Sequence, residues 1–357
     1  MLYIEKKIKT GLAASFLLID YSKKKTSVLL VACIFFLTGC NGNHTEIVYT
    51  GLVMGTTYEV KIVSTKKNDP KLRNIIDARL QKMNRIFTTY DDTSELMVFN
   101  SSPLNVPQAV SSEMIDVLRV SQEIFIKSRG SFDPTVWSLV DLWGFGAVPS
   151  NHVIPDHDSI SNLLALVGLN NISIEEDNNL VARLRDVKLD LSAIAKGYAA
   201  DSVSELLNSM GIDSYLVEVG GELRIKGKKA NGKNWHIAIE KPYISLDGVQ
   251  AIIQVTDSGV ATSGDYRNYF EENGKRYSHT IDPRTGYPIS HNLVSATVIA
   301  DTAAKADAFS TAMMVLGPED AIDIAEENNL AVYLVIKNSN GFDVVFSKAF
   351  APFIIGE

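Results

Sequence analysis

The order of the predicted helices and strands constrains the fold of this chain most. Apolar residues spaced three and four apart predict helices, and β-branched or alternating segments predict strands. Helices are expected at 70–87, from Ser112 as the N-cap to a stop at Gly130, and at 159–167, 193–210, 303–316 and 318–328. Strands are expected within 47–63, around 187–191, and at 214–219, 222–226, 235–240, 249–256, 331–336 and 342–346. Because these elements do not alternate as βαβ units, we predict an α+β fold rather than a doubly wound parallel sheet.

The length and composition allow one large domain or two subdomains. The chain has 357 residues, of which 46% are hydrophobic and 21% charged, so it can bury a sizeable core. We expect residues 1–39 to be a signal peptide, 40–46 a lipidated tether and 47–357 the folded domain, with its division into two subdomains left open.

The first 40 residues indicate an exported lipoprotein. Lysines at 23–25 precede an apolar run over 27–37, which is shorter than the ~20 residues of a membrane-spanning helix and fits a signal-peptide core. The run reaches Leu37-Thr38-Gly39-Cys40, a pattern in which the cysteine is acylated and becomes the mature N-terminus. The alternative is a plain secretion signal with a chance cysteine. We expect a periplasm-facing lipoprotein, with the inner membrane favoured over the outer.

The remaining chain is acidic and lacks thiols. Residues 1–39 hold six lysines and two acidic residues, so 28 Lys and Arg remain against 40 Asp and Glu, a net charge of −12. That charge excludes a basic nucleic-acid footprint, and membrane attachment would come from the lipid. Cys33 lies in the predicted signal, and Cys40 is expected to carry the lipid. The exported domain is therefore expected to have no disulfide, zinc cluster or cysteine nucleophile.

The segment from Asp190 to Tyr198 predicts an anion site. A predicted strand ends in a carboxylate, small residues form a turn, and a helix follows with Lys196 in its first turn. Cations are normally placed at the other end of a helix, because the N-terminus already carries partial positive charge. A phosphate would bind both the lysine and the free N–H groups. The alternative is an exposed lysine on an ordinary helix.

Asp307 and Thr311 predict a metal site. They lie four residues apart on a predicted helix, so their oxygens share one face. Two hard oxygens suit Mg²⁺, which takes few protein ligands and completes its shell with water and phosphate. Alanines at 303, 304, 306, 308 and 312 make this helix narrow enough for close approach of a backbone or ligand. The alternative is a solvated helix face.

His279 is a candidate for proton transfer. It precedes Asp282-Pro283-Arg284-Thr285-Gly286, a turn sequence that would hold the histidine rigidly. Imidazole is the side chain best matched to proton transfer near neutral pH. The alternative is a histidine beside a tight structural loop.

Two further segments combine glycine, aromatic and polar residues. They are Met54-Gly55-Thr56 and Ser131-Phe132-Asp133-Pro134, the second followed by Trp137, Trp143 and Phe145. Such residues can form a slot for a flat ring system, or they can simply pack in a core. The chain has no Ser/His/Asp triad spacing, Walker loop or Rossmann glycine pattern, so a nucleotide would bind in a less common way.

Together these segments resemble the FAD:protein FMN transferases of the ApbE type. The matching stretches, in family order, are 54–56, 132–134 through 142–146, 190–198, 219–221, 262–266, 278–286 and 306–316. The resemblance implies transfer of FMN from FAD to a threonine hydroxyl of a partner protein, with release of AMP. It also implies an α+β architecture related to the T-fold, with mixed and antiparallel sheets and FAD in a cleft.

The resemblance also assigns roles to single residues. It implies that Mg²⁺ is bound by Asp307, Thr311 and the backbone carbonyl of Ala193, and that His279 is the proton acceptor, so that His279 and Asp307 are catalytic. The residues that it places against FAD are Met54, Tyr90, Ser131, Phe132, Asp133, Asp190 and Lys196.

Two other functions fit the same residues. Water in place of the threonine would give a Mg²⁺-dependent FAD pyrophosphatase that yields FMN and AMP, and a flavin-binding lipoprotein would hold FAD unchanged. For the transferase, the resemblance implies an acceptor subunit of a sodium-pumping NADH:quinone reductase or of an Rnf-type complex.

Overall fold

The structure is a computed structural model that describes residues 44–65, 69–146, 154–242, 248–265, 269–272 and 274–356. His44–Glu357 is one compact unit. The predicted signal peptide and Cys40 lie outside the described residues. The first strand begins at Thr45, so it takes in two residues of the range expected for the tether. In the part of the chain that is described, no helix has the length and apolar character needed to span a membrane.

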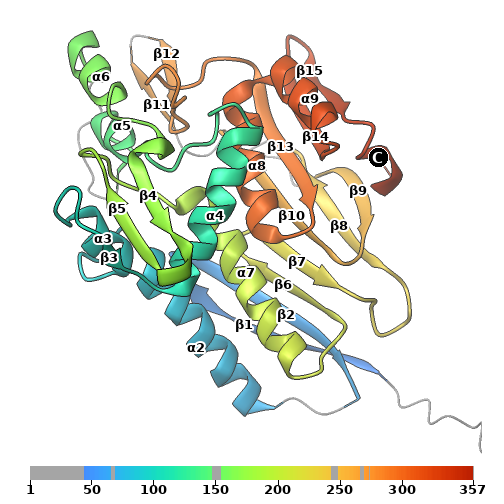
Figure 1. Cartoon of the computed structure of the whole chain (residues 1–357). Coiled ribbons are helices and arrows are strands. Elements are labelled where there is room, and N and C mark those ends of the chain that lie inside the picture. The colour runs from blue at the N-terminus through green and yellow to red at the C-terminus, as the bar shows by residue number, and fades with distance from the viewer. Residues whose placement is uncertain are drawn as a thin grey trace, which may run out of the picture. The chain divides into compact units, whose positions relative to one another are not determined.

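An eight-stranded antiparallel sheet forms the centre of the fold (Figure 1). Its strand order is β1-β2-β6-β7-β10-β13-β14-β15. The strands span Thr45–Val53 (β1), Thr56–Ser64 (β2), Tyr215–Val219 (β6), Glu222–Lys226 (β7), Ser258–Gly264 (β10), Leu293–Ala300 (β13), Ala331–Asn338 (β14) and Gly341–Phe346 (β15). With helices packed against this antiparallel sheet, the predicted α+β class is confirmed.

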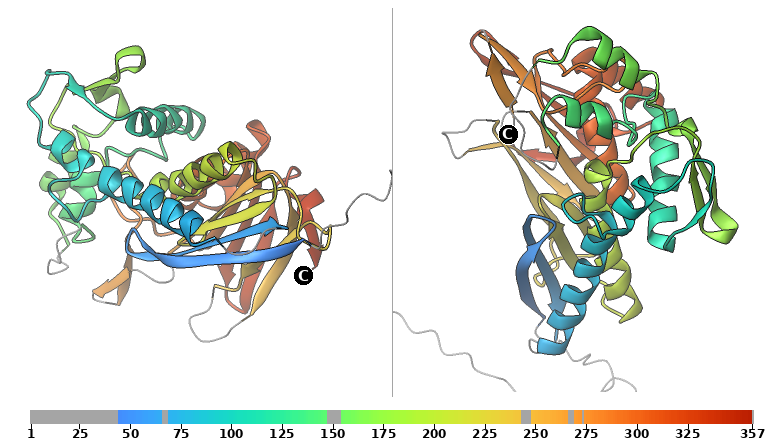
Figure 2. Two further views of the ribbon diagram at one scale, coloured as in Figure 1. Left: turned by 90° about the horizontal axis from the view of Figure 1, so that it is seen from below. Right: turned by 90° about the vertical axis from the view of Figure 1, so that its left-hand side faces the viewer.

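Long helices cover one face of the sheet (Figures 1 and 2). They are α2 (Pro70–Phe87), α4 (Ser112–Lys127), α7 (Ser192–Ser209) and α8 (Ala303–Leu316). Helices α7 and α8 lie directly on the strands, and α4 packs against both of them. The largest apolar core fills the space between these helices and the sheet. Helix α9 (Pro318–Glu327) follows α8 and contacts β14.

A smaller sheet packs on the opposite face. It has the order β16-β9-β8, from Ile354–Gly356, Val249–Val255 and Trp235–Glu240. A second apolar core lies there around Trp235, Tyr333 and Phe350. The central strands are therefore buried on both faces.

Short elements build the end of the molecule at which α7 begins. They are α3 (Glu95–Asn100), β3 (Gln108–Ala109), α5 (Trp137–Leu142), α6 (His157–Leu164), η1 (Leu169–Asn171), β4 (Ile172–Glu175), η2 (Glu176–Asn178), β5 (Leu180–Arg183), β11 (Tyr269–Glu272) and β12 (Lys275–Ser278), while η3 (Ala351–Phe353) precedes β16. A third apolar cluster joins α5 and α6 to Ile281 through Leu139, Trp143 and Ile160.

Two details of the predicted elements were wrong. The N-cap of α4 is Ser111 rather than Ser112: its hydroxyl accepts from the Met114 N–H, and its own N–H donates to Glu95. Residues 187–191 form no regular strand, because their one ladder contact is an isolated bridge between Lys188 and Val136. Apolar residues in that segment are buried as parts of a loop.

Two central strands, β10 and β13, were not among the predicted elements. Strand β13 is buried along nearly its whole length, and β10 is built largely from small residues. A strand covered on both faces has no alternation of apolar and polar residues, so a search for that alternation passes over it.

Candidate functional site

A cavity of about 490 Å³ lies where the first turns of α7 meet α8 and the ends of β7 and β10. Loops 131–136 and 279–283 complete its wall. Its volume is in the range of small-molecule sites, about 300–1,000 Å³. Many of the residues singled out above line it, among them Ser131, Phe132, Asp133, Pro134, Phe145, Asp190, Ala193, Lys196, His279, Pro283, Asp307 and Thr311.

Close contact between α7 and α8 sets the geometry of the site. Gly197 lies so near α8 that a Cβ atom there would be 2.3 Å from the carbonyl oxygen of Ala303. One helix turn further, the Asp201 carboxylate accepts from the N–H groups of Ala303 and Ala304 and so caps α8. The small residues predicted to make α8 narrow therefore allow the two helices to bring Lys196 and Asp307 together.

Two buried carboxylates and one half-buried ammonium group meet in the cavity wall. Lys196 Nζ lies 2.9 Å from Glu222 Oε1 and 3.9 Å from Asp307 Oδ1. The other oxygen of Asp307 accepts from the Gly197 N–H at 3.0 Å. Glu222 and Asp307 are only 5% and 2% exposed. Lys196 is the fifth residue of α7 and so lies in its second turn, which corrects the predicted first-turn position.

One ammonium cannot balance two buried carboxylates. Burial raises the pKa of Glu222 to about 8; Asp307 adds to this rise, and Lys196 opposes it. Burial likewise raises the pKa of Asp307. Burial alone would lower the pKa of Lys196, but Asp307 and Glu222 together raise it above its ordinary value. The cluster therefore keeps a proton on a carboxyl group at pH values at which an exposed carboxyl has lost it.

The retained proton makes the free energy of unfolding depend on pH. Between the ordinary glutamate pKa of 4.5 and about 8, the folded protein binds a proton that the unfolded chain has released. The free energy of unfolding of the metal-free protein should therefore fall as pH rises through this window, by on the order of 1 kcal/mol per pH unit. Urea titrations at several pH values would measure the slope. Glu222→Gln should flatten it, and an equally steep slope in that variant would contradict the assignment.

The three predicted metal ligands all line the cavity. Asp307 and Thr311 lie on successive turns of α8, and Ala193 lies in the first turn of α7. The Thr311 hydroxyl is 3.2 Å from the Ser263 hydroxyl, which also contacts the Ser310 hydroxyl at 2.7 Å. The described residues contain no cluster of three His, Cys, Asp or Glu side chains arranged for a metal. The predicted set has one carboxylate only, with a hydroxyl and a carbonyl.

The 131–133 loop contributes a buried polar rim. The Asp133 carboxylate accepts from the N–H and hydroxyl of Thr135, at 2.8 and 2.6 Å. Burial raises the pKa of Asp133, although hydrogen bonds from Thr135 and Leu169 oppose the rise. The Ser131 hydroxyl is buried and has no hydrogen-bond partner among the described residues. Phe132 belongs to the largest core and also touches the cavity.

Asp190 lies on a loop that buried side chains hold in place. The Asn100 amide forms two hydrogen bonds with the backbone of Leu189, both at 2.8 Å. Asp190 then accepts from the Ser192 N–H at 2.9 Å, at the start of α7. This arrangement fixes the carboxylate at the edge of the cavity.

His279 follows β12 and lines the cavity beside the predicted turn. In that turn, Asp282 accepts from the Gly286 N–H at 2.8 Å, and the Trp143 indole donates to the Gly286 carbonyl. The His279 ring lies edge-on to Phe145, with centroids 6.4 Å apart. Burial raises the pKa of the nearby Asp265, although positive charges at Arg276, His279 and His291 oppose the rise.

Met54 and Tyr90 do not line the main cavity. Met54 lies in the β1–β2 turn with φ of 50° and packs half-buried against the largest core. Tyr90 is 82% exposed and lines an adjoining cavity of about 120 Å³. The two cavities share Val140, Phe145, Asp190 and Ser192, so Tyr90 lies at the margin of the site.

Sequence reasoning missed Glu222. Strand β7 pairs Glu222 with Val219 and Arg224 with Val217, which places both charged side chains on the helix-covered face of the sheet. There Glu222 meets Lys196, and Arg224 lies 3.4 Å from Asp201. The available signal was a matching charge pattern: Glu222 and Arg224 on the strand pair with Lys196 and Asp201, which lie five residues apart on α7. Using this signal requires the register between β6 and β7.

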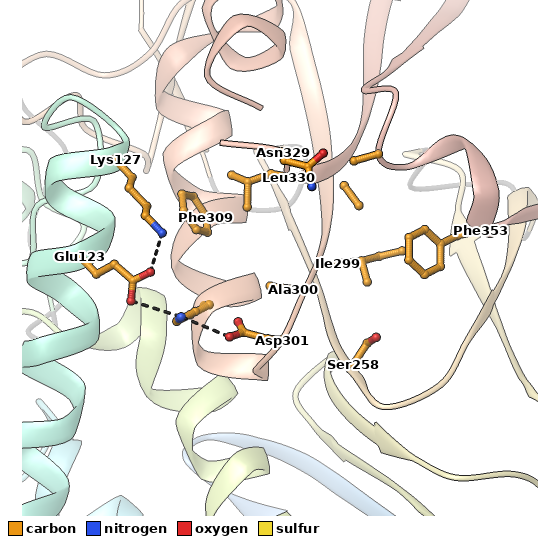
Figure 3. A pocket seen from close by; sticks show the side chains of 13 residues that line it. Glu123, Lys127, Ser258, Ile299, Ala300, Asp301, Phe309, Asn329, Leu330 and Phe353 are labelled. Carbon is orange, nitrogen blue, oxygen red and sulfur yellow. Dashed lines mark hydrogen bonds and ion pairs between the residues drawn. The ribbon is translucent and has the colours of Figure 1, made fainter. Parts of the chain in front are cut away.

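A second cavity, of about 440 Å³, lies between α4, α8 and the end of β13 (Figure 3). Lys127 lies 2.7 Å from Glu123, and Lys305 bridges Glu123 and Asp301 at 3.2 and 3.3 Å. Its lysines are thus engaged in ion pairs, and its described lining includes none of the predicted site residues. We therefore place the functional site in the first cavity.

This antiparallel α+β fold holds a cavity of small-molecule size, lined by acidic side chains and one lysine, where α7 meets α8. The chain belongs to the ApbE family, whose sequence profile matches residues 54–334. The FAD:protein FMN transferase of Haemophilus influenzae is 41% identical over 333 residues, covering 91% of this chain and 96% of that protein.

Solved structures give the same result. The flavin transferase ApbE from Vibrio cholerae superposes with a TM-score of 0.80 at 38% identity, covering 87% of this chain and 99% of that one. The flavinyl transferase ApbE of Pseudomonas stutzeri, in its apo form, also gives 0.80 at 38% identity, with 87% and 97% covered. The resemblance found in the sequence is confirmed.

Proposed function

We propose that this protein transfers FMN from FAD to a hydroxyl group of an acceptor protein and releases AMP. Relatives that are about 40% identical over nearly the whole chain carry the name FAD:protein FMN transferase. The observation that carries the proposal is the convergence of Lys196, His279, Asp307 and Thr311 on one cavity. These residues come from three separate segments of the chain, because Asp307 and Thr311 share α8, and core packing alone gives no reason for the three segments to bring them together.

The site residues fit a Mg²⁺ ion. When both carboxylates are ionised, Glu222 and Asp307 outweigh the single charge of Lys196, and this negative wall would repel a diphosphate. A divalent cation held by Asp307, the Thr311 hydroxyl and the Ala193 carbonyl would make the net charge of this wall positive. All three groups are hard oxygen donors of the kind that Mg²⁺ prefers. When bound, it would neutralise diphosphate oxygens and polarise the phosphorus–oxygen bond.

The protein's own groups supply the remaining chemistry. Lys196 places a positive charge beside the diphosphate, a form of electrostatic stabilisation that is often the largest contribution to catalysis. His279 accepts the proton of the acceptor hydroxyl as its oxygen bonds to the phosphorus of the FMN half. The bond from that phosphorus to the bridging oxygen breaks, and AMP leaves with the bridging oxygen.

A labelling experiment tests this function. The protein is incubated with FAD, Mg²⁺ and a candidate acceptor, and the products are separated under denaturing conditions. We expect flavin fluorescence on the acceptor band and FMN on a threonine by mass spectrometry. Free FMN and AMP with an unlabelled acceptor would instead indicate a FAD pyrophosphatase, and intact FAD would indicate a flavin-binding protein.

We further propose that the acceptor is a subunit of a sodium-pumping NADH:quinone reductase or of an Rnf-type complex. The support is the resemblance of the chain to flavin transferases of this type. Co-expression of each candidate subunit with and without this chain, followed by mass spectrometry, would identify the acceptor. A subunit that carries FMN equally in both cases would be excluded.

Anchoring through Cys40 is proposed from the sequence pattern 37–40. The protein is then a periplasm-facing lipoprotein, held at the inner rather than the outer membrane. Cys40→Ser should abolish incorporation of a labelled fatty acid and move the protein from the membrane fraction to the soluble fraction. Cys33→Ser is the matched control, because Cys33 lies within the predicted signal. Equal labelling of the Cys40→Ser variant would contradict the anchor.

A further inference from the structure

Glu222 has one carboxylate oxygen that nothing described in the structure explains. The residue begins β7, directly after the Gly220–Gly221 turn, and is 5% exposed. Its Oε1 accepts from Lys196 at 2.9 Å, whereas its Oε2 is buried without a hydrogen-bond partner among the described residues. An unsatisfied buried polar atom is costly and therefore rare, so each case calls for a reason.

The position of Glu222 indicates where the missing partner comes from. Glu222 lines the main cavity together with Lys196 and Gly220. Lys196 fixes one end of the carboxylate, so the orientation of Oε2 is set before any ligand arrives. Because Glu222 lines this cavity, a molecule bound in the cavity is the candidate partner for Oε2.

We propose that Glu222 is a substrate-binding residue whose Oε2 forms a hydrogen bond with a sugar hydroxyl of the flavin dinucleotide. This inference rests on the proposed function, in which Lys196 lies beside the diphosphate. The groups next to a diphosphate in FAD are the ribityl chain and the ribose, and both carry hydroxyls. Phosphate oxygens cannot donate to a carboxylate, whereas a hydroxyl can either donate to it or accept from a protonated carboxyl group.

Removing the negative charge of Glu222 and removing its proposed hydrogen bond would change FAD affinity in opposite directions. A negative charge beside a diphosphate weakens its binding, so a variant without that charge should bind FAD more tightly if Glu222 made no contact. Loss of a hydrogen bond to a charged group instead weakens binding by about 10- to 100-fold. The direction of the change therefore separates the two cases.

The test compares Glu222→Leu with the wild-type protein by calorimetry, with Mg²⁺ present and acceptor absent. We expect FAD affinity to fall about 10- to 100-fold while inorganic pyrophosphate, which has no sugar hydroxyl, binds at least as tightly as before. The variant should fold, because Lys196 keeps Asp307 as its partner. Thermal unfolding checks this, and Glu222→Gln, which keeps the shape and the contact with Lys196, provides a second variant with a smaller expected loss.

FMN and ADP then show which sugar is involved. Weaker binding of FMN to Glu222→Leu assigns the ribityl chain, weaker binding of ADP assigns the ribose, and either result supports the proposal. Glu59→Leu, on β2, is the matched control and should leave all affinities unchanged, because β6 separates β2 from β7 and Glu59 does not line the cavity.

Unchanged or tighter FAD binding by Glu222→Leu would overturn the inference. Equal losses of affinity for FAD and for pyrophosphate would also overturn it, because Glu222 would then act only through Lys196. A wild-type protein that binds no FAD would instead refute the proposed function itself.

Discussion

Replacing Asp307 with asparagine is expected to abolish Mg²⁺-dependent FMN transfer while the fold persists. Asparagine keeps an oxygen that can accept from the Gly197 N–H, so the contact between α7 and α8 is retained. The negative charge is lost, and with it the strongest donor of the proposed metal site. We expect the transfer rate to fall by about 10²- to 10³-fold or more, the effect of removing a principal electrostatic stabiliser.

Stability measurements separate this loss from misfolding. Asp307→Asn leaves Lys196 with one buried carboxylate, Glu222, so the charge cluster becomes balanced. The thermal midpoint of the metal-free variant should equal or exceed that of the wild type, and its affinity for Mg²⁺ should fall. Asp301→Asn is the matched control: Asp301 precedes α8 but lies outside the main cavity, with its side chain 70% exposed. Wild-type transfer by Asp307→Asn would remove the metal assignment.

The helices were predicted more accurately than the strands, for a physical reason. Helix α2 spans 70–87 as predicted, because Asp69 caps it, Pro70 begins it, and one side carries a regular apolar stripe. These are local signals, readable within one segment. Strands β10 and β13 are central, and their burial on both faces depends on a second sheet that the local sequence does not specify.

The residues of the site also divide into those with a local signal in the sequence and those without one. Lys196 and Asp307 were predicted because each is anomalous locally: the lysine lies near a helix N-terminus, and the aspartate lies in a run of alanines. Glu222 looks like an ordinary strand residue until the register of β6 and β7 brings it to Lys196, 26 residues away. Residues whose role depends on a non-local partner cannot be found from spacing alone.

The alanine variant of His279 should bind FAD normally but transfer FMN poorly. His279 lies in the cavity wall behind a turn that Trp143 and Asp282 hold, so its removal should leave the wall in place. The acceptor hydroxyl is a weak nucleophile, and a positioned base contributes about 10²- to 10⁴-fold to its reactivity. We expect a loss of transfer in that range and an FAD dissociation constant within a few-fold of the wild-type value.

Two readouts distinguish a proton acceptor from a structural histidine. Imidazole in the buffer should restore part of the transfer rate of His279→Ala, because the small base can occupy the vacated space and accept the same proton. His236→Ala, an exposed histidine on β8, is the control and should transfer at the wild-type rate. A parallel loss of FAD affinity and transfer, with no rescue, would mean that His279 binds the flavin instead. In that case the proton of the acceptor hydroxyl would have to pass to another group of the cavity, and the buried carboxylates beside Lys196 would be the first residues to substitute.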